Sequence, residues 1–245
     1  RVFSQHGLDG VLERVFECAG TDSRLFIEIG TQAAMQCSTR HLRVRHAFRG
    51  YMFDDGHEDC RIGLKKTFVD PGEVVGLVTS TLAEGDPQRS VPATTPAHLD
   101  LLAIDTDGGD FRLWQSLCNG GVRPRVVVLE VALRESRRGM VPLPLMESLS
   151  RSCGYSLVHT VCNDAVFVRA DVVAAAAERG SPFIRVGDLA WHLSREERRL
   201  QATEALEKDR ASFFNAGLQG RTFESLSAID PDAEHLHNGV LSHEG

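Results

Sequence analysis

The sequence has no excess of positive charge. Its 245 residues contain 27 Lys and Arg against 34 Asp and Glu, a formal net charge of −7 at pH 7, and the isoelectric point is near 5.8. Binding to a phosphate backbone or to an anionic lipid surface requires a broad positive potential. We therefore expect neither nucleic acid nor a membrane surface among the partners of this protein.

Long hydrophobic runs are also missing. One of the longest is the short apolar segment around residues 126–129, far below the ~18 consecutive apolar residues that cross a bilayer. The composition, 42% hydrophobic and 25% charged, is ordinary for a folded chain and excludes disordered and collagen-like proteins. We expect a soluble protein with one sizeable core and a smaller appendage.

Closely spaced cysteines are absent as well. No C-x-x-C pair occurs among the six cysteines, which are Cys18, Cys37, Cys60, Cys118, Cys153 and Cys162. Zinc knuckles need close ligands, and a chain of this length needs no disulfides. We expect free, mostly buried thiols and no metal site, which leaves the compartment open and only slightly favours the cytoplasm. Because the chain begins with Arg1, we expect a fragment or a processed protein.

Helix-like and strand-like segments alternate over the first 170 residues. Helical spacing of apolar residues predicts a helix that starts near residue 8 and that Gly20 ends. Short apolar runs predict strands at 25–29, 51–53, 67–69, 99–105, 125–130, 155–161 and 165–169. Predicted helices between them cover 37–44, 72–78, 111–118 and 145–153. Strands that are apolar on both faces and separated by helices are typical of a parallel sheet covered on both sides.

The end of this pattern predicts the remaining organisation. The last two strands flank the turn at 162–164, which predicts an antiparallel hairpin at the edge of the sheet. Residues 79–98 lack periodicity and predict a long loop, and residues 194–214 predict a charged helix. We therefore expect an α/β domain over residues 1–170 and a helical, partly irregular extension over residues 171–245.

Acidic residues follow the predicted strands. Glu28 lies at the end of the first, Asp54 and Asp55 follow the second, Asp105 and Asp107 follow the fourth, and Glu130 ends the fifth. Turns and helix caps use Asp for structural reasons alone. The carboxyl ends of parallel strands meet at one edge of a sheet, however, where open α/β sheets bind ligands. The shared placement of these acids favours a binding site.

The first loop predicts a nucleoside cofactor. Gly30 directly follows a strand, and Asp54 lies 54 − 30 = 24 residues further on, close to the ~20 expected for an acid that binds the two ribose hydroxyls. The loop lacks the second and third glycines that bring backbone against a pyrophosphate, which disfavours a dinucleotide. Glu28 offers an anion suited to an ammonium or sulfonium group.

Several segments together resemble the FkbM-like methyltransferases. The resemblance spans roughly residues 4–170, and its segments occur in the order of the family. They are SQHGLDG at 4–10, FIEIG at 26–30, CSTR at 37–40, GYMFDDGHE at 50–58, DLLAIDTDGGD at 100–110 and RPRVVVLE at 123–130. This resemblance implies a Rossmann-like, seven-stranded methyltransferase sheet, mostly parallel with an antiparallel C-terminal edge strand. It also implies S-adenosylmethionine as cofactor and transfer of its methyl group, usually to a hydroxyl oxygen.

The resemblance also implies roles for individual residues. Glu28, Gly30 and Thr31 match the cofactor loop, Asp54 matches the ribose-binding acid, and Asp105 matches the acid that faces the cofactor. The sequence departs from the family at Leu8, where an acid is usual, at Ala33-Ala34, which replace Asp-Gly, and at Gly109, which is often Asn.

Methyl transfer to a hydroxyl benefits from a nearby group that takes up the proton. The candidates are Asp107, which matches a position near the acceptor, and His57, which is equally well explained as a loop histidine. Phe111 and Trp114 could line an acceptor pocket, although residues on such a helix more often belong to the core. The acceptor itself, a small molecule or a glycan, has no signature in the sequence.

Two alternatives remain open. Asp105-Thr106-Asp107 also has the form of the D-x-D that holds a divalent ion in glycosyltransferases using nucleotide sugars, although that hypothesis leaves Glu28-Ile29-Gly30 unexplained. The substitutions at Ala33-Ala34 keep a third interpretation open, a degenerate binding module without catalysis.

Overall fold

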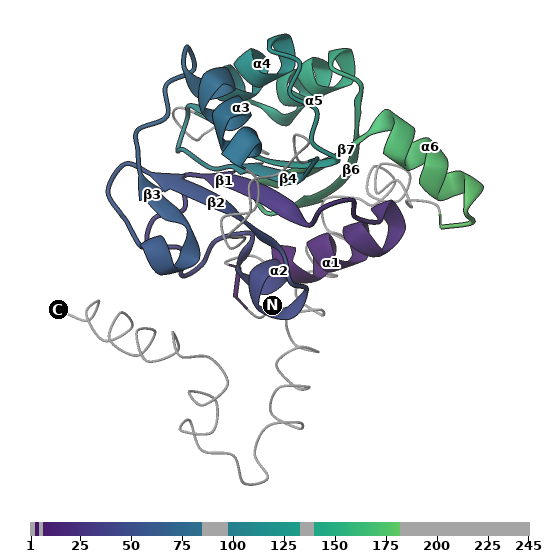
Figure 1. Ribbon diagram of the computed structural model, residues 1–245. Helices are drawn as coiled ribbons and strands as arrows, with labels where there is room; N and C mark the ends of the chain where they lie inside the picture. Colours follow the sequence, from purple (N-terminus) through teal and green to yellow (C-terminus); the bar gives the residue numbers. More distant parts are fainter. Residues whose placement is uncertain (1–2, 5–6, 85–97, 133–139, 182–245) are drawn as a thin grey trace, which may run out of the picture. The chain divides into compact units, whose positions relative to one another are not determined.

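The computed structural model describes residues 3–4, 7–84, 98–132 and 140–181 (Figure 1). The chain divides into two compact units, Arg1–Gly187 and Asp188–Gly245, and all described residues belong to the first. Its elements are α1 (Leu8–Ala19), β1 (Leu25–Ile29), α2 (Arg40–Arg45), β2 (Arg49–Asp54), the 3₁₀ helix η1 (Cys60–Ile62), β3 (Leu64–Lys66), α3 (Val74–Glu84), β4 (Leu99–Ile104), α4 (Asp110–Asn119), β5 (Val126–Glu130), α5 (Leu143–Ser152), β6 (Tyr155–Val161), β7 (Asp164–Arg169) and α6 (Ala170–Glu178).

The strands form one seven-stranded sheet in the order β3-β2-β1-β4-β5-β7-β6. The first five strands pair in parallel, whereas β7 is antiparallel to both of its neighbours. This arrangement is the Rossmann-like methyltransferase fold, so the predicted fold class is confirmed. The antiparallel strand is β7, the last strand in the sequence. In the sheet it lies between β5 and β6, so β6 forms the edge.

Helices cover both faces of the sheet (Figure 1). Along β1 the side chains alternate: Leu25, Ile27 and Ile29 pack with α3, α4 and α5, while Phe26 packs with α1, α2 and α6. Successive side chains of a strand point to opposite faces, so a strand covered on both faces is apolar at nearly every position. This accounts for the continuous apolar runs in the sequence.

Most of the predicted elements are present within a few residues of their predicted bounds, but the second helix is shorter than predicted. It begins at Arg40 rather than at Cys37. The backbone N–H groups of Ser38 and Thr39 donate to the carboxylate of Glu28 instead of entering a helix. A distant acid therefore delays the start of α2 by three residues.

The third predicted strand was wrong. The strand that pairs with β2 is residues 64–66, where Leu64 is buried, and not residues 67–69. The N–H of Thr67 still donates to the carbonyl oxygen of Asp54 at 2.7 Å, after which the chain leaves the sheet. Phe68 is 72% exposed, so an apolar run of three residues here did not mark a buried segment.

The predicted loop at 79–98 was wrong at its start, because α3 continues to Glu84. The hydroxyl groups of Thr79 and Thr81 donate to backbone carbonyl oxygens one turn earlier, so these polar residues are accommodated in the helix. Residues 85–97 lie outside the described part of the chain, as does the helix predicted at 194–214. The division between residues 1–170 and 171–245 stays a prediction.

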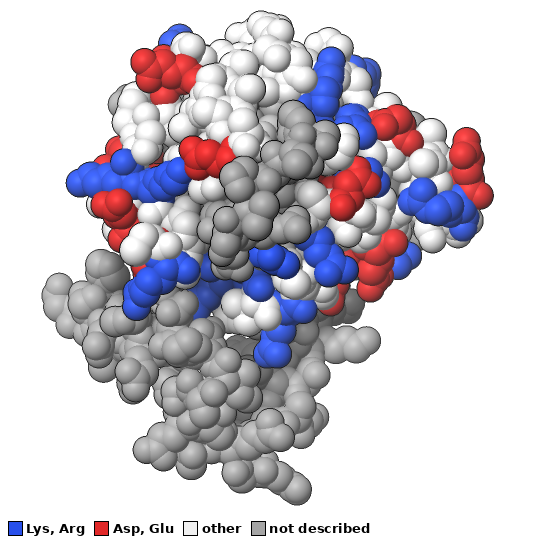
Figure 2. All heavy atoms as spheres, in the orientation of Figure 1, with Lys and Arg blue, Asp and Glu red and all other residues white. Residues whose placement is uncertain are grey.

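Several expectations about single side chains are settled. Trp114 is fully buried, donates to the hydroxyl of Ser150 at 3.0 Å and packs edge-on against Tyr155, so it belongs to the core and not to a pocket. All six cysteines are free, but only Cys18, Cys37 and Cys118 are buried, so the expectation of mostly buried thiols was wrong. No helix in the described ranges is long and apolar enough to span a membrane. Basic and acidic side chains are interspersed over the visible face, with basic ones gathered over α2 (Figure 2).

A buried carboxylate fixes the turn between α1 and β1. Asp100 on β4 is fully buried and accepts the N–H groups of Asp22, Ser23 and Arg24 at 2.6–3.0 Å. The guanidinium of Arg125 lies 3.6 Å from the same carboxylate. Buried amides need acceptors, and a charged acceptor forms the stronger bonds. Asp100 therefore ties the start of β1 to β4.

We expect Asp100→Asn to lower the free energy of unfolding by about 1.5–3 kcal/mol, because the amide keeps one acceptor oxygen and loses the charge that serves three donors. Urea denaturation measures the change. Glu58→Gln, at an exposed position, is the control and should change stability by less than about 0.5 kcal/mol. Equal stability of the two variants would contradict this role of Asp100.

Candidate active site

A cavity of about 940 Å³ lies at the carboxyl ends of the parallel strands. All seven residues that the sequence singled out line it: Glu28, Gly30, Thr31, Asp54, His57, Asp105 and Asp107. They come from the carboxyl ends of β1, β2 and β4 and from the loops that follow these strands, which are neighbours in the sheet. The structure thus brings the predicted residues together in one place, and its volume is typical of a site for a small organic ligand.

Gly30 is required by the packing of the strands themselves. Its φ is +82°, and a Cβ atom there would lie 1.7 Å from the carbonyl oxygen of Asp105. The N–H of Gly30 donates to Phe53 on β2, and the N–H of Asp105 donates to Ile29. The first atoms that exclude a side chain at Gly30 therefore belong to the protein backbone itself and not to a ligand.

Glu28 holds the loop after β1. It is 3% exposed, and its carboxylate accepts the N–H of Ser38 at 2.7 Å and both the N–H and the hydroxyl of Thr39. Burial raises the pKa of Glu28, and these hydrogen bonds oppose that shift. Both carboxylate oxygens are thus engaged by protein donors. Glu28 shapes the wall of the cavity by fixing where loop 31–39 runs.

Loop 31–39 has an unusual backbone. Thr31 is buried, and its carbonyl oxygen accepts the N–H of Ala34. Gln32 and Ala34 both have positive φ, at 49° and 57°, a conformation that favours glycine. Ala34, one of the substitutions noted in the sequence, therefore keeps a glycine-like backbone with a buried methyl group.

Asp54 joins the loops after β1 and β2. One oxygen accepts the N–H of Gln32 at 2.6 Å, and the other accepts the N–H groups of Gly56 and His57 and lies 2.8 Å from the Nδ1 atom of His57. Burial raises the pKa of Asp54, but the bonds from His57, Gly56 and Gln32 outweigh it, so this pKa lies below its usual value. Asp54 is a fixed anion at the edge of the cavity.

The imidazole of His57 is half exposed, whereas Asp54 is 9% exposed. With Nδ1 held by Asp54, the other ring nitrogen is left as the one available to the cavity. The structure thus joins two residues that the sequence analysis had assigned to separate roles.

Carboxylates gather on the other side of β1. Oxygens of Asp105, Asp107 and Glu130 lie within 4.8 Å of one another, and Asp164 also lines this wall. Asp164 starts β7, which runs antiparallel to β5, so it pairs in register with Glu130. Among the described residues, the Oε2 atom of Glu130 has no hydrogen-bond partner. We call Asp105, Asp107, Glu130 and Asp164 the acidic wall.

Three members of the acidic wall, Asp105, Glu130 and Asp164, have raised pKa values. Burial, together with the charges of Asp110 and Asp107, raises the pKa of Asp105 to about 6. Burial and the charge of Asp105 raise the pKa of Glu130 to about 8 and that of Asp164 to about 7. Crowded carboxyl groups cannot all ionise without a compensating cation. The wall therefore favours a positively charged ligand or one that takes part in proton transfer.

Sequence reasoning missed two parts of this site. Asp164 lies in a hairpin, and only the antiparallel order of β7 brings its first residue to the carboxyl edge of the sheet. Phe68, Val69 and Pro71 also line the cavity, and Phe68 was assigned to a strand. The alternation of the predicted hairpin could have indicated Asp164, but no signal in the sequence places Phe68 beside β2.

Comparisons with known proteins give little for this chain. No family model matches it, and no curated protein matches it. Among solved structures, it is similar to one titled "Structure of the Pyocyanin Biosynthetic Protein PhzM", with 12% identity and a TM-score of 0.29. The match covers 66% of this chain and 55% of that one, so the chain spans about half the length of that protein.

We expect the acidic wall to make stability fall as pH rises. A carboxyl group whose pKa is raised by folding stabilises the fold fully below its unfolded pKa, and this contribution is lost as the pH passes through its folded pKa. For Asp105, Asp164 and Glu130 that window runs from about pH 4 to about pH 8. Urea denaturation at a series of pH values measures it.

Glu130→Gln should flatten this decline, because glutamine has the size of glutamate and does not titrate. Glu58→Gln, exposed and distant from the wall, should keep the wild-type slope. If wild type and Glu130→Gln lose stability equally between about pH 5 and about pH 8.5, the acidic wall does not titrate as described.

Proposed function

We propose that this protein is an S-adenosylmethionine-dependent methyltransferase of the FkbM-like type that methylates a hydroxyl group on a small molecule or a glycan. One observation carries the proposal: a single cavity combines a fixed anion at the end of β2, the tight turn at Gly30, and the acidic wall at the ends of β4 and β5 and the start of β7. The fold is that of S-adenosylmethionine-dependent methyltransferases, and the sequence blocks that resemble the family border this cavity.

The residues after β2 suit a ribose. Asp54 is charged, because its pKa is lowered, and its Oδ2 atom accepts the N–H of Gln32. A carboxylate oxygen has two lone pairs, so Oδ2 can accept a further hydrogen bond from a ribose hydroxyl. His57 and Gly56 hold the other oxygen, which keeps the carboxylate in position.

The residues after β3 suit the base of a nucleoside. Phe68 and Val69, which follow β3, line the cavity, and β3 is the strand on the far side of β2 from β1. An aromatic ring that is 72% exposed offers a face on which a purine can stack. The nucleoside would then lie across the ends of β1, β2 and β3.

The acidic wall suits the positive end of the cofactor. β2 and β4 lie on opposite sides of β1, and two strand spacings amount to about 9.6 Å. A ligand whose ribose is bound by Asp54 therefore extends toward Asp105 and Glu130. Ionised carboxylates there stabilise a sulfonium and an ammonium group.

Asp107 is the better candidate for the group that accepts the proton. S-adenosylmethionine, when bound, supplies a methyl group on positively charged sulfur. Asp107 lies after β4, within the acidic wall, where its carboxylate can take the proton of an acceptor hydroxyl. His57 lies after β2 and contacts Asp54, so we assign it to positioning Asp54 and the ribose. The walls of the cavity serve to align the acceptor and to exclude water.

A metal-dependent glycosyltransferase is the second candidate. The close approach of Asp105, Asp107 and Glu130 oxygens is the observation that favours it, because hard divalent cations prefer carboxylate ligands. This hypothesis gives no role to the loop that Glu28 holds. The two candidates differ in the ligand and in the need for a metal ion.

Thermal unfolding separates them. We expect S-adenosylhomocysteine without metal to raise the melting temperature, by linkage to binding. Under the second candidate, UDP or GDP would raise it only with Mn²⁺. A shift with the nucleotide and Mn²⁺ alone would overturn the proposal, and no shift with either ligand would favour a binding module without catalysis.

We expect Asp54→Ala to weaken S-adenosylhomocysteine binding by about 1–3 kcal/mol, because charged hydrogen bonds to the ribose are lost. Isothermal titration calorimetry measures the affinity. Glu58→Ala, at an exposed position that does not line the cavity, is the control and should bind as wild type does. Unchanged affinity in a folded Asp54→Ala variant would reject the ribose assignment.

A further inference from the structure

A second cluster of metal-ligating side chains lies on the opposite face of the sheet from α3 and α4. It consists of Glu13 on α1, His41 on α2, and His46, which ends α2. The Nε2 atoms of the two histidines are 3.3 Å apart. The carboxylate of Glu13 lies 3.1 Å from the Nε2 atom of His46 and 3.7 Å from that of His41. Three ligand atoms therefore converge on one point.

We propose that Glu13, His41 and His46 bind a divalent transition-metal ion, with zinc as the best match. Imidazole nitrogens and a carboxylate are ordinary zinc ligands. Two Zn–N bonds of about 2.0–2.1 Å at the tetrahedral angle hold the nitrogens about 3.3 Å apart, which is the separation observed between His41 and His46. The two distances from Glu13 bracket the same value.

An ion pair without metal explains this arrangement less well. The two Nε2 atoms face each other, and only one proton fits between them. If both Nε2 atoms carried a proton, two hydrogen-bond donors would face each other with no acceptor between them. His41 is buried, and within the described ranges its Nδ1 atom has no hydrogen-bond partner. A metal ion uses both Nε2 lone pairs and the carboxylate at once.

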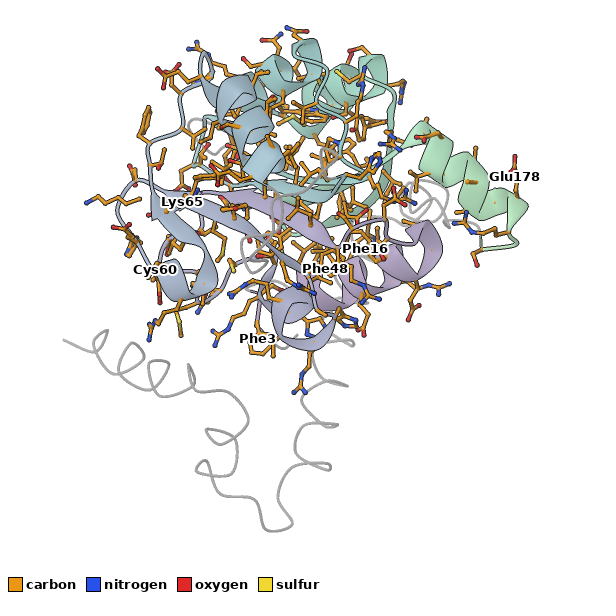
Figure 3. The ribbon with its side chains drawn as sticks, viewed as in Figure 1. Phe3, Phe16, Phe48, Cys60, Lys65 and Glu178 are labelled. Carbon is orange, nitrogen blue, oxygen red and sulfur yellow. The ribbon has the colours of Figure 1, made fainter. Side chains whose placement is uncertain are left out.

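The cluster is open to solvent on one side. Glu13 and His46 line a cavity of about 510 Å³, and their side chains are 44% and 34% exposed, whereas that of His41 is 10% exposed. Phe16 and Phe48 also line this cavity, between α1 and the sheet, and their ring centroids are 4.8 Å apart (Figure 3). Three protein ligands and access to water leave a fourth coordination position for solvent.

A metal here would cross-link two helices. Glu13 is in the middle of α1, while His41 and His46 belong to α2, which starts one residue after Thr39. Thr39 donates to Glu28, so α2 follows directly from the loop that lines the candidate active site. Zinc that joins α1 to α2 stabilises this part of the fold, and this inference is independent of the proposed methyl transfer.

The test compares zinc binding between variants of the full chain. After treatment with EDTA, wild type is titrated with Zn²⁺ by calorimetry, and bound zinc is counted after dialysis. The chain contains ten histidines and six cysteines, which can also bind zinc elsewhere. The readout is therefore the difference in bound zinc between wild type and each variant. Each of three variants should bind one equivalent of zinc less than wild type: Glu13→Gln, His41→Asn and His46→Asn. This corresponds to at least a tenfold loss of zinc affinity at that site.

Two neighbours serve as controls. Glu17→Gln changes a carboxylate on the same helix, and His98→Asn removes an exposed imidazole; both should bind as much zinc as wild type. Zn²⁺ should also raise the melting temperature of wild type and of both controls, and Mg²⁺ should not. Equal zinc content in all six proteins would overturn the proposal.

Folding defects are separated by a second measurement. Circular dichroism without metal shows whether each variant is folded, and His46→Asn, at the end of a helix, is the substitution that the fold should tolerate best. Crystals of wild type soaked in Zn²⁺ should show anomalous scattering between Glu13, His41 and His46. Absence of a peak there, with zinc bound elsewhere, would also reject the site.

Discussion

The contact on which the candidate site depends is the one at Gly30. Here β1 ends between β2 and β4, and its last backbone groups bond to Phe53 and Asp105 so closely that no side chain fits. The three strand ends are therefore held side by side at one edge of the sheet. The loops that follow carry Thr31, Asp54 and Asp107, so their positions in the cavity depend on this approach of backbone to backbone.

Charge is distributed unequally across the cavity. On the β2 side, Asp54 accepts hydrogen bonds from several N–H groups, which keep it ionised. On the β4 side, Asp105, Glu130 and Asp164 crowd one another with few donors, so burial and mutual repulsion raise their pKa values. Two regions built from the same residue types thus have opposite properties. Asp54 stays ionised, whereas the buried carboxyl groups on the β4 side hold protons that they would release when a cation binds.

Sequence patterns predicted the fold well because its strands are buried on both faces. Residues 99–104 and 126–130 are apolar at almost every position for that reason, and helices between parallel strands follow from the connections that such strands need. The failures at α2 and β3 came from contacts with other parts of the chain. The start of α2 depends on Glu28, ten residues away from Ser38, and β3 depends on a pairing with β2 that a run of three apolar residues does not reveal.

By itself, the sequence determined the class of sheet, the order of its elements and the set of acids that follow the strands, because these depend on local periodicity and on turn chemistry. Only the tertiary structure decided which acids are free to act. It engaged Glu28 with the loop, joined His57 to Asp54, and brought Asp164 to Glu130 through an antiparallel strand. It also placed His41 and His46 against Glu13. Hydrogen-bond partners and proton affinities depend on distances across the fold, which no spacing along the chain contains.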